Sequence, residues 1–222
     1  MNSEHTHSPA AAFFLPCLFS ALFLLSSCRT MYYGVQESFG RHKRDILKSN
    51  VVKARADQEQ AQEEFKSALE ALMELTEFDG GELEKFYKRL DSRYQRCQAK
   101  ADDISGRIES IETVAGDLFK EWEHEADTMS NRDLQRQSLD QLQSTRDRYR
   151  TMVRSMVDAR EKMNPVLQAL HDHVLFLKHN LNAQAIGSLQ GEVVKIDREV
   201  QELIAEMQEA IFEAERFIQG ME

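Results

Sequence analysis

Proline and glycine, the residues that most often interrupt regular secondary structure, are scarce in this sequence. The 222 residues include three prolines and nine glycines, and aromatic residues make up only 8% of the chain. Charged residues, in contrast, make up 30%. A chain with many charges and so few breaks is typical of long helices or coiled coils rather than of β-sheets. We therefore predict an all-α protein.

The sequence also lacks the excess of positive charge that a general nucleic-acid-binding protein needs. Its formal net charge is −10 at pH 7, whereas binding to nucleic acid requires a dominant basic face that displaces the counterions of the phosphates. We therefore expect no nucleic-acid partner.

Cysteine is also rare. The chain has only Cys17, Cys28 and Cys97, which are too few for a disulfide framework.

Familiar catalytic patterns are missing as well. The sequence has no glycine-rich phosphate-binding loop, no Gly-x-Gly-x-x-Gly after a strand and no Gly-x-Ser-x-Gly. Glu121 and His124 form one Glu-x-x-His pair, but the di-iron site of a helical bundle needs a second such pair, and no other histidine from His42 onward has a glutamate at that spacing. We predict a protein that is not an enzyme and has no cofactor, metal ion or small-molecule substrate. An enzyme with a site at a helix end is the alternative.

The start of the chain resembles the leader of a bacterial lipoprotein. Residues 10–25 form an apolar run that is short for a transmembrane helix but suits the core of a signal peptide. Residues 25–28, Leu-Ser-Ser-Cys, follow the lipobox pattern of an aliphatic residue, two small residues and a cysteine. We predict a signal peptide at residues 1–27, lipidation of Cys28, and a lipid anchor with a juxtamembrane linker at 28–40.

Other interpretations of the N-terminus stay open. No lysine or arginine precedes Cys28, although the start of a signal peptide is normally positive. One alternative is an ordinary signal peptide with an incidental cysteine, and another is translation from Met31, which gives a cytosolic coiled-coil protein. Arg29 stands where lipoproteins retained at the inner membrane commonly carry aspartate. We therefore expect a lipid-anchored protein of the bacterial cell envelope, on the periplasmic face of the outer membrane.

Apolar residues recur every three or four positions through most of the remaining chain. Four such stripes run from Leu47 to Leu75, from Leu83 to Trp122, from Leu142 to Leu177 and from Ile186 to Phe217. This spacing, sustained over at least four heptads, is the signature of supercoiled helices, and short connections make neighbouring helices antiparallel. We predict that residues 41–219 form an elongated antiparallel bundle or coiled coil of about four long helices.

The predicted seams between these helices are looser than a leucine zipper. Residues other than large aliphatic ones occupy many seam positions, including Gln58, Tyr87, Tyr94, Cys97, Tyr149 and His173. We interpret His173 as a core histidine rather than a metal ligand. Because such seams pack less tightly, a second copy of the chain or another envelope protein is an expected partner.

The stripes are separated by recognisable helix ends. Residues 78–81 contain two glycines that suit a helix C-terminus, and residues 130–133 resemble a capping box that opens a helix. Asn180 and Asn182 suit a tight turn before the last helix. Pro165 is an exception, because the apolar register continues unbroken across it. We therefore predict that Pro165 kinks a continuous helix.

Two stretches are candidates for contact with other molecules. Near the predicted anchor, aromatic and basic side chains resemble a membrane-interface element: Tyr32, Tyr33, Arg41, Lys43 and Arg44. After an unusually apolar stretch, polar residues form a possible partner-binding tip: Lys178, His179, Asn180 and Asn182. The simpler interpretations are a solvated helix start for the first stretch and a capped, buried helix end for the second.

Several short elements of the chain resemble the bacterial domain-of-unknown-function family 2959. They lie at residues 42–47 (HKRDIL), 78–81 (FDGG), 118–122 (LFKEW), 165–167 (PVL) and, most specifically, 176–183 (FLKHNLNA). The resemblance extends from about Tyr32 to Ile218 and implies a helical, coiled-coil protein that is lipidated or secreted. The family has no established activity, so the resemblance supplies no catalytic residues.

Together these features favour a non-enzymatic, lipid-anchored envelope lipoprotein that acts as a coiled-coil scaffold or interaction module. The first alternative is a curved, BAR-like dimer that shapes membranes with the basic segment 41–55. The expected partners are the membrane, through the lipid anchor, and other envelope proteins or a second copy.

Overall fold

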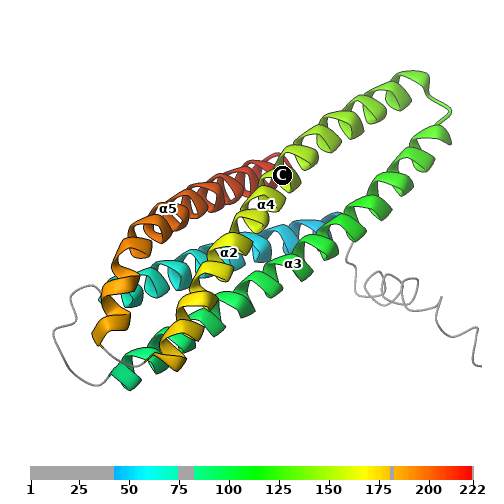
Figure 1. Ribbon diagram of the computed structural model, residues 1–222. Coiled ribbons are helices and arrows are strands. Elements are labelled where there is room, and N and C mark those ends of the chain that lie inside the picture. The colour runs from blue at the N-terminus through cyan, green and yellow to red at the C-terminus, as the bar shows by residue number, and fades with distance from the viewer. Residues whose placement is uncertain (1–42, 75–82, 181–182, 222) are drawn as a thin grey trace, which may run out of the picture. The chain divides into compact units, whose positions relative to one another are not determined.

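Four long α-helices make up the part of the chain that the computed structural model describes, residues 43–74, 83–180 and 183–221. They are α2 (Lys43–Met73), α3 (Leu83–Asp127), α4 (Arg132–His179) and α5 (Ala183–Gln219). Each helix packs against the next one along the chain, and α5 closes the ring against α2 (Figure 1). These residues contain no strand. The predicted all-α, antiparallel bundle of four long helices is therefore confirmed.

The bundle forms because the four apolar stripes meet in one core. The largest fully buried side chains come from all four helices: Leu47, Phe65, Leu72, Leu90, Ile104, Ile108, Ile111, Leu142, Met152, Met156 and Phe217. His173 is also buried, and its Nδ1 lies 2.7 Å from the carbonyl oxygen of Ala169. Its interpretation as a core residue is correct.

The predicted seam is less accurate in α3 than in the other helices. Some predicted seam residues are only half-buried: Tyr87, Tyr94, Leu118 and Trp122 in α3, and Tyr149 in α4. Phe86, Val114 and Phe119 are buried instead. A straight α-helix has 3.6 residues per turn, so a strict heptad drifts around it by about 20° per repeat. Over the 45 residues of α3 this drift moves the buried face to neighbouring positions.

A polar side chain caps the start of α4. The Asn131 side chain accepts hydrogen bonds from the backbone N–H groups of Asp133, at 3.0 Å, and Leu134, at 3.2 Å. A capping box over residues 130–133 would begin at Ser130, so the prediction locates the helix start but misplaces the cap by one residue. The predicted break at residues 78–81 lies outside the described residues.

Helix α4 continues through Pro165, as the unbroken apolar register predicts. Met163 and Val166 are buried on either side of it, whereas Pro165 itself is exposed. Proline removes a backbone donor and crowds the preceding turn, which costs about 3 kcal/mol in a helix interior.

Pro165→Ala should therefore raise the free energy of unfolding by about 2 kcal/mol, since the greater freedom of the unfolded chain offsets up to about 1 kcal/mol of the gain. Thermal unfolding followed by circular dichroism measures this difference. A melting temperature below that of the parent would contradict a continuous α4 and would make Pro165 the start of a separate helix.

Cys97 lies in the core, as its seam position predicts, and its side chain is fully buried. Burial, with a smaller contribution from the negative charge of Glu64, raises the pKa of the thiol to about 12. Because the thiolate is the reactive form, we expect Cys97 to react slowly with a thiol reagent in the native protein and quickly in denaturant. Replacing the other two cysteines by alanine isolates its signal. Fast labelling of the native protein would mean that this part of α3 is exposed.

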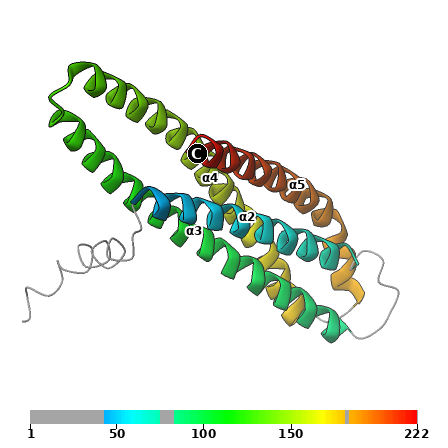
Figure 2. The ribbon, with the colours of Figure 1, turned by 180° about the vertical axis from the view of Figure 1, so that it is seen from behind.

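The helices differ markedly in length. Helices α3 and α4 have 45 and 48 residues, whereas α2 and α5 have 31 and 37. Ion pairs fix the register of α2 on α3: Lys43 Nζ lies 2.8 Å from the Glu121 carboxylate, and Arg107 Nε lies 3.0 Å from that of Asp57. The residues of α3 after Glu121 therefore extend past the start of α2 (Figure 2).

Candidate functional site

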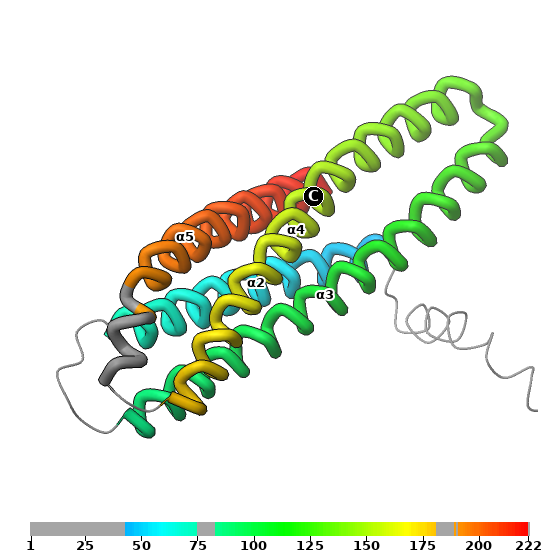
Figure 3. The backbone as a smooth tube through the Cα atoms, in the orientation of Figure 1, coloured from blue at the N-terminus to red at the C-terminus, as the bar shows by residue number. Residues whose placement is uncertain are grey.

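The α3–α4 hairpin continues beyond the part of the bundle where four helices pack together. Helices α2 and α5 stop short of its end, whereas α3 runs to Asp127 and α4 starts at Arg132 (Figure 3). We call residues 122–141 the extension. Of the four described helices, only α3 and α4 reach the extension, and Met129 and Leu134 remain 38% and 55% exposed.

Side-chain contacts hold the two helices of the extension together. Trp122 Nε1 donates a hydrogen bond of 2.9 Å to the hydroxyl of Ser138. Arg146 forms an ion pair of 2.7 Å with Glu123, and this hydrogen-bonded guanidinium lowers the pKa of the Glu123 carboxyl below its ordinary value. The same guanidinium lies 5.7 Å from the ring centroid of Phe119. The extension is therefore a braced pair of helices.

A hollow of about 220 Å³ lies where the extension meets the four-helix part of the bundle. Leu118 and Trp122 give it apolar walls, Arg44 and Glu121 add charges, and Met221 lines it from the residues after α5. An apolar centre with a charged rim is typical of surfaces that bind another protein. This hollow and the extension together form the candidate interaction site.

Two of the predicted membrane-contact residues lie beside this hollow. Lys43 pairs with Glu121 of α3, and the Arg44 guanidinium donates a hydrogen bond to the backbone carbonyl of Met221. Both cations hold the first turn of α2 to its neighbours, and their contact with lipid stays a prediction. The other predicted N-terminal site residues lie outside the described part of the chain: Cys28, Tyr32, Tyr33 and Arg41.

The predicted partner-binding tip lies at the opposite end of the bundle. Lys178 and His179 are exposed in the last turn of α4. Asn180 caps this helix, because its side-chain amide donates a hydrogen bond of 2.9 Å to the carbonyl oxygen of Phe176. This contact favours the capped helix end as the role of Asn180. Asn182 lies outside the described residues.

The described residues include side chains that are possible metal ligands and reactive groups. Among them, no three histidine, cysteine or carboxylate side chains could hold a metal ion together. Burial raises the pKa values of Cys97 and Tyr149 to about 12 each, which makes the thiol a poor nucleophile and the phenol a poor proton donor near neutral pH.

None of the four described helices contains an apolar stretch long enough to cross a bilayer.

Reasoning from the sequence does not find the extension, although one signal is present. No apolar stripe continues between Trp122 and Leu142, and most side chains there are polar. An interruption of the apolar stripe on both sides of the α3–α4 turn is consistent with the tip of a two-helix hairpin that no other helix covers. The sequence does not show that α2 and α5 end before this gap.

The model of a family described as "Protein of unknown function (DUF2959)" matches residues 32–221, a range that includes all four helices. No curated protein sequence matches the chain.

Proposed function

Because the chain belongs to the DUF2959 family, whose description gives no function, we propose a role from the residues of the chain itself. The protein is a non-enzymatic lipoprotein of the bacterial cell envelope, anchored through Cys28 on the periplasmic face of the outer membrane. Its helical bundle acts as a scaffold, and the extension binds another envelope protein.

The extension is the observation that carries this proposal. Two helices braced by the Trp122–Ser138 hydrogen bond present Met129 and Leu134 to solvent, next to a hollow with apolar walls. Exposed apolar groups beside such a hollow are typical of protein-interaction surfaces. The braced geometry keeps these side chains in place before a partner arrives, which lowers the entropy lost on binding.

The anchor is supported by the lipobox at residues 25–28 and the apolar run before it. Two or more acyl chains attach a protein stably to a membrane, whereas a single chain attaches it only marginally. The fifteen residue steps from Cys28 to Lys43 span at most about 50 Å when fully extended. The first residue of the bundle therefore stays within about that distance of the membrane surface.

A BAR-like, membrane-shaping role is an alternative with less support. It requires the basic segment 41–55 to face lipid, but Lys43 pairs with α3, and Arg55 Nη1 lies 3.3 Å from the Glu215 carboxylate of α5. Cations that already pair with carboxylates contribute less to binding of anionic lipid. Tubulation of liposomes by the purified protein would favour this alternative.

Site-specific photocrosslinking in living cells tests the proposed role. A photoreactive residue replaces either Leu134 or Leu175, a residue of α4 near the other end of the bundle that is 41% exposed. We expect a discrete crosslinked protein from position 134 alone, and we expect its loss when Cys28→Ala removes the anchor. A crosslink from position 175 alone would favour the tip at Lys178 instead. Equal crosslinking from both positions would contradict a specific role of the extension.

A further inference from the structure

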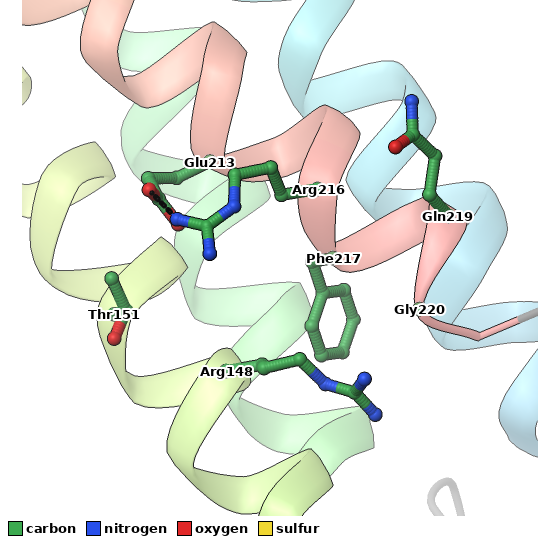
Figure 4. Close-up of a pocket in the computed structure, with 7 residues that line it drawn as sticks. All are labelled: Arg148, Thr151, Glu213, Arg216, Phe217, Gln219 and Gly220. Atoms are coloured by element: carbon green, nitrogen blue, oxygen red, sulfur yellow. Dashed lines mark hydrogen bonds and ion pairs between the residues drawn. The ribbon is translucent and has the colours of Figure 1, made fainter.

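A second hollow, of about 390 Å³, lies between α4 and α5. Figure 4 shows that Arg148 and Thr151 line it from α4, and Glu213, Arg216 and Phe217 from α5. The Phe217 ring is buried and supplies an apolar surface. A hollow of this volume is within the range of small-molecule sites.

Arg148 is the unusual residue of this hollow. Arg146, two residues earlier, pairs with Glu123 at 2.7 Å, but within the described part of the chain Arg148 has no carboxylate partner. Its Nε is buried without a hydrogen-bond partner there, and its Nη2 donates only a long bond of 3.4 Å to Thr145 Oγ1. Arg148 is half-buried, and because buried polar groups are normally hydrogen-bonded, this guanidinium indicates a site for an anion.

Gly220 has no side chain, and the Arg148 guanidinium occupies the space that a side chain at this position would fill. A Cβ atom at residue 220 would come within 2.8 Å of Nη1 and 3.0 Å of Cζ of Arg148. The side chain of Arg148 would then have to move. The position of the Arg148 guanidinium therefore depends both on α4, which carries it, and on Gly220 at the end of α5.

The other wall of the hollow is close to electrically neutral. Arg216 Nη1 lies 2.7 Å from the carboxylate of Glu213, so their charges compensate each other and Arg148 contributes an uncompensated positive charge. One guanidinium can donate two parallel hydrogen bonds to the oxygens of a phosphate.

We propose that this hollow binds the phosphate group of a small molecule, either a soluble phosphate compound or the headgroup of an anionic lipid. Arg148 donates hydrogen bonds to the phosphate from Nη1 and Nη2 and supplies the positive charge, because the charge of Arg216 is already balanced by Glu213. This site takes a different ligand from the extension, although Gly220 lines both hollows.

A phosphorus NMR titration of the full-length protein in detergent tests the proposal. One arm uses inorganic phosphate and the other uses dihexanoyl phosphatidylglycerol, both at constant ionic strength. We expect saturable binding in at least one arm, and the tighter arm identifies the source of the phosphate. Arg148→Gln should weaken this binding by about tenfold or more, because it removes charge-assisted hydrogen bonds.

Two further variants make the result specific. Arg154→Gln removes the same charge from an exposed position of α4 and should leave binding unchanged. Gly220→Ala keeps every charge but displaces the guanidinium, so it should weaken binding even if Arg148→Gln fails to fold. Absence of saturable binding in both arms, or equal weakening by Arg154→Gln, would overturn the proposal. Binding that appears only in Glu222→Gln would also overturn it, because a carboxylate of the chain itself would then fill the hollow.

Discussion

Cys28→Ala should abolish fatty acylation of the protein and leave it either unprocessed or released from the membrane. Cys28 is the only cysteine in the predicted lipobox at residues 25–28, and without its thiol no diacylglycerol can be attached. Stable anchoring needs two or more acyl chains, so the loss of attachment should be complete rather than partial. Metabolic labelling with a fatty-acid analogue, followed by separation of membrane and soluble fractions, measures both effects.

The other two cysteines provide matched controls for this experiment. Cys17 lies inside the apolar run of the predicted signal peptide, and Cys97 is buried in α3. Cys17→Ala and Cys97→Ala should therefore be labelled as strongly as the parent. If Cys28→Ala is also labelled as strongly, the lipobox interpretation is wrong.

Gln58→Met should make the bundle more stable. Gln58 is 1% exposed in the core stripe of α2, yet within the described residues its Oε1 and Nε2 have no hydrogen-bond partner. A buried polar group without a partner costs about 1–3 kcal/mol. Methionine has a similar size and an unbranched chain without a charged or amide group, so it removes this cost and keeps the packing. The melting temperature should rise by roughly 2–4 °C for each kcal/mol gained.

An exposed glutamine separates the effect of burial from the effect of the residue type. Gln137 lies on the surface of α4, so Gln137→Met should change the free energy of unfolding by no more than about 0.5 kcal/mol. Chemical denaturation of both variants measures the difference. A Gln58→Met protein that is less stable than the parent would show that the amide contributes to the native packing.

The helical bundle could be predicted because it depends on a local periodicity. Val51, Met156 and Val200 recur at heptad positions of their helices and are fully buried. The continuity of α4 through Pro165 was visible for the same reason, since the apolar register is intact on both sides of the proline. Both features can be predicted without knowing which residues of the neighbouring helices pack against each side chain.

The candidate site could not be predicted in this way, because it depends on how far each helix reaches along its neighbours. Heptad spacing does not give the level along α3 at which α2 begins, and it therefore cannot show which residues of α3 lie beyond the four-helix part of the bundle. Arg148 likewise looks like any surface arginine in the sequence. Only the packing of α4 against Gly220 reveals a guanidinium without a carboxylate partner among the described residues.

Mass spectrometry of the N-terminal peptide of the mature protein tests the central claim, a lipid-anchored envelope protein, most directly. We expect the peptide to begin at Cys28 and to carry the mass of at least two acyl chains. A peptide that begins at Met31, or one that contains Cys28 without any acyl chain, would contradict the claim.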